Sequence, residues 1–159
     1  MNKKTAIVPG SFDPMTLGHV DLVTRAAKIF DEVLVVVAEN ENKKYMLTPK
    51  ERVEAAKIAL EGVENASVTY TDGIVADVAA KVGAVALVKG IRNSADLEYE
   101  NNIAKVNKEL APELETVYLP ASGEYATVSS TSVRKLFSYG LPIEQLVGKK
   151  VAEYITKSR

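Results

Sequence analysis

The sequence contains no cysteine and a single histidine, His19, among its 159 residues. The absence of cysteine excludes disulfides, a thiolate nucleophile and thiolate metal ligands. One histidine cannot complete a zinc site of the usual composition, so we expect no metal site built from protein ligands. A reducing compartment is compatible with this composition.

Long apolar runs are also missing. No segment approaches the length that spans a membrane, and the short apolar run after the basic N-terminus ends at Pro9, which is too early for a signal peptide core. We therefore expect a cytoplasmic protein without a membrane partner. The formal net charge of −1 gives no overall field that attracts nucleic acid, so any anion must be bound by a local group of cations.

Three common catalytic motifs are absent as well. There is no Gly-x-x-x-x-Gly-Lys-Ser/Thr P-loop, the stretch from Gly10 to Gly18 does not fit Gly-x-Gly-x-x-Gly, and no Gly-x-Ser-x-Gly elbow occurs. His19 is also the only histidine that could act as the general base for a serine nucleophile, which weakens a hydrolase interpretation. These absences favour a group transfer that needs no covalent enzyme intermediate.

What is present is a regular alternation of strands and helices. Hydrophobic residues make up 47% and charged residues 26%, as in soluble globular proteins, and the length suits one domain covering residues 1–159. Strands are predicted at 5–8, 32–37, 67–70, 85–88 and 116–119. Helices are predicted at about 19–29, 49–60, 74–82 and 95–110, then one opening at 129–132 and two short ones. We therefore expect an α/β fold with a doubly wound, five-stranded parallel sheet.

The loops after the strands carry most of the chemically useful side chains. In such sheets ligands bind outside the carboxyl ends of the strands, where the strand order reverses. The loops at that edge carry Ser11 and His19, Lys43 and Lys44, Lys89 and Arg92 (in a predicted loop at 89–93), and the serine and threonine cluster at 129–132. Each group alone has a structural explanation, either a solvated loop or a helix cap. Together they favour a site for a polyphosphate.

A phosphate monoester as acceptor would explain this set of residues. Such an acceptor is already an anionic nucleophile, so the enzyme only has to align it with the α-phosphorus of a nucleoside triphosphate and stabilise the departing pyrophosphate. We assign the catalytic roles to His19 at the α-phosphate, Lys43 at the acceptor phosphate with Lys89, and Arg92 at the β- and γ-phosphates with residues 129–131.

The segment from Pro9 to His19 carries a family resemblance. It reads Pro-Gly-Ser-Phe-Asp-Pro-Met-Thr-Leu-Gly-His, and it joins a predicted strand to the N-terminus of a predicted helix, where unpaired N–H groups attract phosphate. The complete string resembles the signature of the adenylyl- and cytidylyltransferases. Thr16 replaces the first histidine of their His-x-Gly-His motif, which resembles the bacterial phosphopantetheine adenylyltransferase family.

The resemblance covers nearly the whole chain. Further matching blocks lie at residues 43–44, 48–52, 89–92, 96–100, 112–115 and 128–133. The family implies a Rossmann-like fold, a homohexamer, and transfer of AMP from ATP, with Mg²⁺, to 4′-phosphopantetheine. The products are 3′-dephospho-coenzyme A and pyrophosphate, in the penultimate step of coenzyme A biosynthesis.

The family positions also imply two sets of binding residues. The pantetheine substrate would be contacted by Ser11, Lys43, Val75 and Lys89. ATP would be contacted by Ser11, Phe12, His19, Gly90, Ile91, Arg92, Glu100, Tyr125, Ala126, Thr127, Val128, Ser129, Ser130 and Thr131, with His19 as the transition-state stabiliser. Ser11 and Thr131 keep the hydroxyl of the usual threonine and serine, whereas Lys89 replaces an arginine and loses its bidentate fork.

Two other classes of function fit part of the pattern. A nicotinate-mononucleotide adenylyltransferase or a cytidylyltransferase shares the opening motif and the 129–134 block, and differs from this sequence at 89–100. A non-catalytic nucleotide-binding regulator on the same sheet would bind ATP without releasing pyrophosphate.

Overall fold

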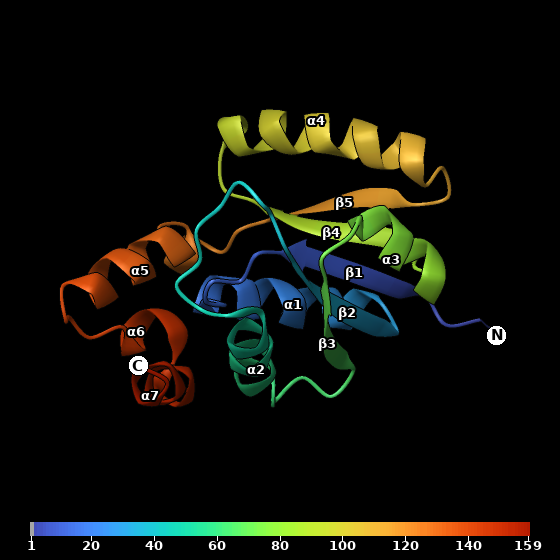
Figure 1. Cartoon of the computed structure of the whole chain (residues 1–159). Coiled ribbons are helices and arrows are strands. Elements are labelled where there is room, and N and C mark those ends of the chain that lie inside the picture. Colours follow the sequence, from blue (N-terminus) through green and yellow to red (C-terminus); the bar gives the residue numbers. More distant parts are fainter. Residues whose placement is uncertain (1) are drawn as a thin grey trace.

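The computed structural model describes residues 2–159, and its strands and helices alternate as predicted (Figure 1). The strands are β1 (Thr5–Gly10), β2 (Glu32–Ala38), β3 (Ala66–Thr71), β4 (Ala86–Ile91) and β5 (Glu115–Pro120). The helices are α1 (Leu17–Ile29), α2 (Pro49–Ala59), α3 (Val75–Val82), α4 (Ser94–Leu110), α5 (Ser130–Ser138), α6 (Glu144–Val147) and α7 (Lys149–Lys157), with a short 3₁₀ turn at Gly123–Tyr125. The five strands form one parallel sheet in the order β3-β2-β1-β4-β5, which confirms the expected α/β fold.

The core lies on both faces of this sheet. Val33, Val35, Val36 and Val37 of β2 are all buried, as expected for a parallel strand covered on both sides. On one face, side chains of β1, β2 and β4 pack against α1 and α2, and on the other they pack against α3. Helix α4 runs along the β4–β5 side of the sheet (Figure 1).

The last three helices form a smaller cluster that packs against α2. Its buried residues are Leu47, Ala55, Val133, Ile143, Val147, Val151 and Ile155. Because Val133 belongs to this cluster, the start of α5 is held at the carboxyl edge of the sheet. Within the described residues no helix is both long and apolar enough to cross a membrane.

Two strands extend two or more residues further at their carboxyl ends than the sequence predicted. Lys89 and Gly90 were expected in a loop, but β4 continues through them to Ile91 because its pairing with β5 continues, with Lys89 opposite Tyr118. In the same way, β1 continues through Pro9 and Gly10 because it stays paired with β2. The predicted loop at 89–93 was therefore wrong over its first three residues, and these residues line the sheet edge from within a strand.

The strands β1 and β4 separate before their carboxyl ends. Their pairing covers only Ala6 and Ile7 of β1, whereas the pairing of β1 with β2 runs over the whole of β1. Pro9 has no N–H to offer to a neighbouring strand, which favours this separation. The sheet thus opens between β1 and β4, where the strand order reverses, and a crevice forms at that point.

The start of α2 confirms a boundary that the sequence specified in detail. Thr48 Oγ1 accepts the N–H of Glu51 at 3.1 Å, and Glu51 Oε2 accepts the N–H of Thr48 at 2.8 Å. Pro49 occupies the first helical position, where its missing N–H costs nothing. This capping box fixes where the polar loop after β2 ends and α2 begins.

Candidate active site

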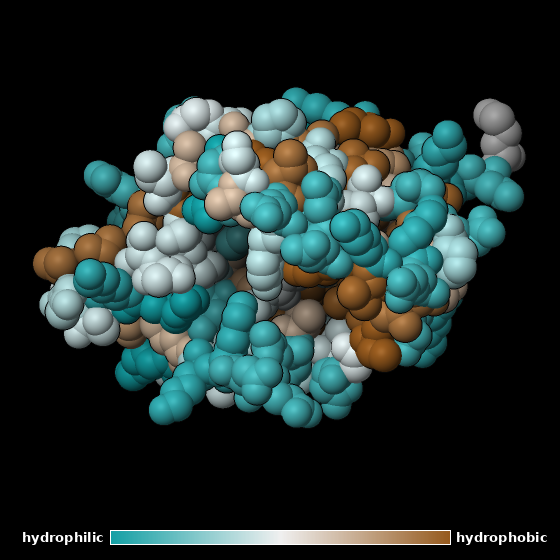
Figure 2. Space-filling view, turned by 90° about the horizontal axis from the view of Figure 1, so that it is seen from above, coloured by the Kyte–Doolittle hydropathy of each residue, from teal (hydrophilic) through white to brown (hydrophobic). Residues whose placement is uncertain are grey.

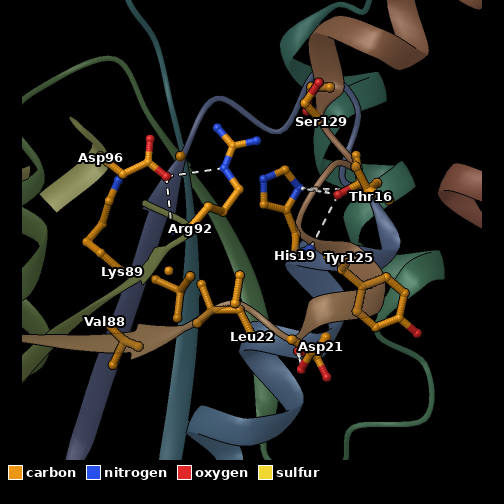
Figure 3. Close-up of a pocket in the computed structure, with 18 of the residues that line it drawn as sticks. Thr16, His19, Asp21, Leu22, Val88, Lys89, Arg92, Asp96, Tyr125 and Ser129 are labelled. Atoms are coloured by element: carbon orange, nitrogen blue, oxygen red, sulfur yellow. Dashed lines mark hydrogen bonds and ion pairs between the residues drawn. The ribbon is translucent and has the colours of Figure 1, made fainter. Parts of the chain in front are cut away.

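A cavity of about 280 Å³ lies in the crevice between β1 and β4. Its walls come from the ends of both strands, the first turns of α1, the start of α4 and the segment that leads into α5. Figure 3 shows the polar side chains of this cavity converging from these elements. The lining residues are Val8, Pro9, Gly10, Phe12, Thr16, Gly18, His19, Asp21, Leu22, Arg25, Val88, Lys89, Gly90, Arg92, Asp96, Glu100, Ala121, Ser122, Tyr125, Val128, Ser129 and Ser130.

The turn after β1 is shaped by the aromatic ring of Phe12. This residue has φ = 48°, in the left-handed region that L residues rarely adopt, and its ring is buried. A Cβ on Gly10 would lie 3.0 Å from that ring, so Gly10 leaves the room that Phe12 occupies. The ring then meets His19 edge to face, with 5.0 Å between centroids, and this contact helps to orient the imidazole.

Thr16 and His19 cap the start of α1 reciprocally. Thr16 Oγ1 accepts the N–H of His19 at 3.3 Å, and Nδ1 of His19 accepts the backbone N–H of Thr16 at 3.0 Å. A backbone N–H can only donate, so Nδ1 is unprotonated and the neutral ring carries its proton on Nε2. In Figure 3 the ring lies between Thr16 and Arg92. The sequence prediction treated the N–H groups here as unpaired, but that of His19 is bound by Thr16.

The environment of His19 keeps the imidazole neutral. Burial, as the largest cause, and the positive charges of Lys89 and Arg92 together lower the pKa of His19 to about 4. A group with this pKa carries no charge near neutral pH. His19 is therefore equipped to act as a hydrogen-bond donor through Nε2 rather than as a general acid or base.

The two cations on the β4 side of the cavity are paired with carboxylates of α4. Lys89 Nζ lies 3.4 Å from Glu100. Asp96 Oδ2 accepts the backbone N–H of Arg92 at 3.1 Å and its Nε–H at 3.2 Å, and Figure 3 shows both bonds. These pairs hold Lys89 and Arg92 in defined positions facing His19, and they leave Arg92 with further donors on its guanidinium.

Ser11 and Lys43 form a second polar pair next to the cavity. Lys43 Nζ donates to Ser11 Oγ at 3.2 Å, although the two residues are far apart in sequence. Lys43 and Lys44 belong to an exposed loop, as the sequence suggested. The loop is anchored by Asp13, which is buried and accepts the N–H groups of Met46 and Leu47 at 2.8 and 2.9 Å.

The serine and threonine cluster at the start of α5 makes hydrogen bonds that hold the helix start in place, and part of it lines the cavity. Ser129 is the N-cap, because its Oγ accepts the N–H of Ser132 at 3.1 Å. Ser130 Oγ donates to the carbonyl of Pro14 at 2.8 Å, and Thr131 Oγ1 accepts from Arg134 at 3.1 Å. Ser129 and Ser130 line the cavity, so the N-terminus of α5 faces the same space as His19.

The structure brings most of the predicted residues together and leaves some outside the cavity wall. Phe12, His19, Lys89, Gly90, Arg92, Glu100, Tyr125, Val128, Ser129 and Ser130 line it. Ser11, Lys43, Val75, Ile91, Ala126, Thr127 and Thr131 do not. Ser11 and Lys43 are next to it, and Val75 opens α3 and packs half-buried against the core of the other sheet face.

Sequence reasoning missed several polar residues of the site. Asp96 was noted only as part of a predicted helix and of a matching block, Asp21 and Arg25 were not singled out, and Asp13 was noted only as part of the first motif. Asp21 accepts from Arg25 and from Ser122, so these residues link α1 to the segment after β5. The one signal available was the spacing of four residues that places Asp96, in the first turn of the helix, next to Arg92 just before its N-cap.

Comparison with known proteins gives a consistent result. Residues 7–136 match the family model described as cytidylyltransferase-like. A phosphopantetheine adenylyltransferase of Levilactobacillus brevis is 43% identical over 93% of this chain and 92% of its own length. One of Finegoldia magna is 41% identical over 98% of this chain and 96% of its own. A solved structure described as a putative nicotinate-nucleotide adenylyltransferase from Vibrio parahaemolyticus superposes with a TM-score of 0.72 at 19% identity, covering 98% of this chain and 93% of that one, which shows a shared fold.

The state of His19 can be measured directly because the chain has no other histidine. In ¹⁵N-resolved NMR spectra of untagged protein we expect a neutral ring with its proton on Nε2 and a titration midpoint near pH 4. Lys89→Met should raise that midpoint because it removes a neighbouring positive charge, and Lys150→Met, at a remote surface pair with Glu61, should not. A midpoint near 6.5, or a proton on Nδ1, would contradict this assignment.

The lowered pKa of His19 also makes the stability of the fold depend on pH. Because the pKa of His19 is lower in the folded chain than its ordinary 6.5, the unfolded chain binds this proton more readily. The contribution of His19 to the free energy of unfolding is therefore complete above about pH 6.5 and is lost as the pH falls toward 4. In His19→Asn the amide oxygen can replace Nδ1 as the acceptor, but the side chain does not titrate. The free energy of unfolding, measured by chemical denaturation, should therefore fall less over this pH range in the variant than in the parent.

Proposed function

The chain belongs to the phosphopantetheine adenylyltransferases, and from this membership we propose that its crevice joins ATP to 4′-phosphopantetheine. The reaction transfers the adenylyl group, gives 3′-dephospho-coenzyme A and pyrophosphate, and is the penultimate step of coenzyme A biosynthesis. The observation that supports it best is the opening between β1 and β4, where His19, Arg92 and the N-terminus of α5 face one cavity. The same edge carries Ser11 and Lys43 in contact.

The chemical step is a direct displacement at the α-phosphorus of ATP. The phosphate of 4′-phosphopantetheine attacks, the bond from the α-phosphorus to the bridging oxygen breaks, and pyrophosphate leaves. The acceptor is an anion near neutral pH, so no general base is required. The site's contribution is then to bring the two anions together in line and to stabilise the charge that develops on the departing oxygens.

His19 suits the α-phosphate in this reaction. Its unprotonated Nδ1 is occupied by Thr16, so Nε2–H is available as a donor with a fixed direction. Because its pKa is lowered to about 4, it donates as a neutral group and loses no proton during the reaction. A preorganised donor of this kind stabilises the transition state without reorganising when the charge develops.

The donor phosphates and the acceptor phosphate would be held by different residues. Arg92, Ser129, Ser130 and Thr131 would hold the β- and γ-phosphates, since the guanidinium and the N-terminus of a helix both bind anions. Ser11, Lys43 and Lys89 would hold the acceptor phosphate. Val75 would contact the pantetheine chain, as its family position implies; it lies at the start of α3, outside the cavity wall.

The remaining ATP positions surround the same cavity. Phe12, Gly90, Glu100, Tyr125 and Val128 line it, whereas Ile91, Ala126 and Thr127 are their immediate neighbours in sequence. We propose that Mg²⁺ arrives as part of the MgATP substrate. Mg²⁺ prefers phosphate oxygens and water with few protein carboxylates, and within residues 2–159 no group of three or more histidine or acidic side chains could hold a metal ion.

We also propose that the working form is a cytoplasmic homohexamer. Helix α4 has no buried residue, although it carries a series of apolar side chains. Its exposed apolar residues are Leu97 (39%), Tyr99 (66%), Ile103 (38%), Val106 (54%) and Leu110 (54%). Figure 2, which looks at the molecule from the α4 side, shows hydrophobic surface among the charged residues. An exposed patch of this kind is typical of a contact between subunits.

The substrates can be identified with a matrix of pyrophosphate-release assays. We expect release with ATP and 4′-phosphopantetheine, and rates at least about 100-fold lower when CTP replaces ATP or nicotinate mononucleotide replaces phosphopantetheine. A preference for either replacement would assign the chain to a sister activity. ATP binding without release with any acceptor would indicate a regulator.

The same assays test the role of His19 with the variant His19→Ala, which removes the donor to the α-phosphate. Loss of one such donor should lower kcat by about 10²- to 10³-fold with little change in the KM for either substrate. Turnover within a few-fold of the parent would show that His19 has no role at the α-phosphate.

The assembly can be checked by light scattering at micromolar concentration. The parent chain should give six times the chain mass. A double substitution on the exposed face of α4, Tyr99→Glu with Val106→Glu, should give a smaller species because two charges cannot be buried in an apolar contact. A monomer mass for the parent, or a hexamer that survives the double substitution, would contradict this arrangement.

A further inference from the structure

Arg52 is a charged residue completely buried in the protein. Its side chain is 0% exposed, and it extends from α2 to the carboxyl edge of the sheet. Nη1 donates to the carbonyl of Ser11 at 3.0 Å and to that of Ala38 at 3.3 Å, while Nη2 donates to Glu39 at 2.6 Å. One guanidinium therefore joins the end of β1 to the end of β2.

The same guanidinium also supports the loop that carries Lys43. Its carbon lies 3.9 Å from the centre of the Tyr45 ring, in a cation–π stack. The Tyr45 hydroxyl accepts the N–H of Asn40 at 2.8 Å, and the carbonyl of Asn40 accepts the N–H of Lys43 at 3.0 Å. The loop from Asn40 to Tyr45 is thus held by hydrogen bonds within itself, and its Tyr45 ring stacks on the guanidinium of Arg52.

Both sets of contacts act on the pair formed by Ser11 and Lys43. Arg52 binds the backbone of Ser11, and through Tyr45 it supports the loop of Lys43. Lys43 Nζ in turn donates to Ser11 Oγ at 3.2 Å. Arg52 reaches neither Oγ of Ser11 nor Nζ of Lys43, so it acts on this pair through the backbone and the loop.

We propose that Arg52 is a positioning residue for the acceptor phosphate, which sets the distance and direction between Ser11 and Lys43. The assignment rests on the proposed function, because that function places the acceptor phosphate at this pair. The fork of an arginine is required, since it serves two carbonyls and a carboxylate while its flat face stacks on Tyr45. A lysine has one compact donor group and cannot make all of these contacts.

A purely stabilising role explains this residue less well. Burying a charge is expensive, and well-packed apolar residues often stabilise such positions at least as much as a buried ion pair does. In addition, Nε of Arg52 has no hydrogen-bond partner among residues 2–159. Stability alone therefore does not account for a buried guanidinium here, and a role in fixing the geometry of the site does.

The test compares Arg52→Met and Arg52→Lys with Leu114→Ala in the full chain. Leu114 is buried in the core of the other sheet face, so its truncation lowers stability without touching the loop. For Arg52→Met we expect the KM for 4′-phosphopantetheine to rise at least tenfold, while the KM for ATP changes less than threefold. Arg52→Lys should recover part of this loss, and Leu114→Ala should change neither KM.

A second measurement does not depend on activity. Limited trypsin digestion followed by mass spectrometry reports cleavage after Lys43 and Lys44, and we expect it to be several times faster in Arg52→Met than in the parent or in Leu114→Ala. Unchanged cleavage, or KM values for both substrates that rise together as melting temperature falls, would overturn the positioning role. If the parent shows no turnover with 4′-phosphopantetheine, the proposed function fails, and the cleavage rates still decide whether Arg52 fixes the loop.

Discussion

The early separation of β1 from β4 is the constraint on which the rest of the site depends. A parallel sheet buries both faces and sends all strand ends to one edge, but side chains at that edge can converge only where the sheet opens. Here the β1–β4 pairing stops after Ile7, and Pro9 supplies no N–H to continue it. The cavity, the turn that carries His19 and the α4 carboxylates that hold Lys89 and Arg92 all lie around this opening.

Within the opening, the Thr16 and His19 cap converts a sequence signature into chemistry. The threonine that replaces histidine in the family motif closes the first turn of α1, and the histidine completes the cap with its Nδ1. This pair of hydrogen bonds therefore begins the helix and selects the ring nitrogen that carries the proton. Burial and two neighbouring cations then keep that ring neutral. Substituting Thr16 would remove the hydroxyl that accepts the N–H of His19, whereas the backbone N–H that selects the tautomer would remain.

The sequence predicted the order and type of the strands and α-helices that the structure describes, but not the 3₁₀ turn at Gly123–Tyr125, and it predicted the edge at which the site lies. The alternation of strand and helix patterns, the run of valines in β2 and the Thr48 capping box each depend on residues that are close in sequence. Such patterns do not require knowledge of how distant segments pack. What it missed depends on contacts between distant segments. Lys89 continues a strand because β5 pairs beside it, Asp13 anchors Met46 and Leu47, and Arg52 reaches Ser11. No periodicity encodes such partners, because each is set by how the elements pack.

In the proposed reaction both substrates occupy one crevice and react in a single in-line displacement. The most direct test is the stereochemical course at the α-phosphorus, followed with ATP made chiral there by oxygen isotopes or by sulfur. A single displacement inverts the configuration, and we predict inversion in the 3′-dephospho-coenzyme A that forms. Retention would require two displacements through a covalent adenylyl-enzyme, and it would contradict the direct transfer that this arrangement of residues supports.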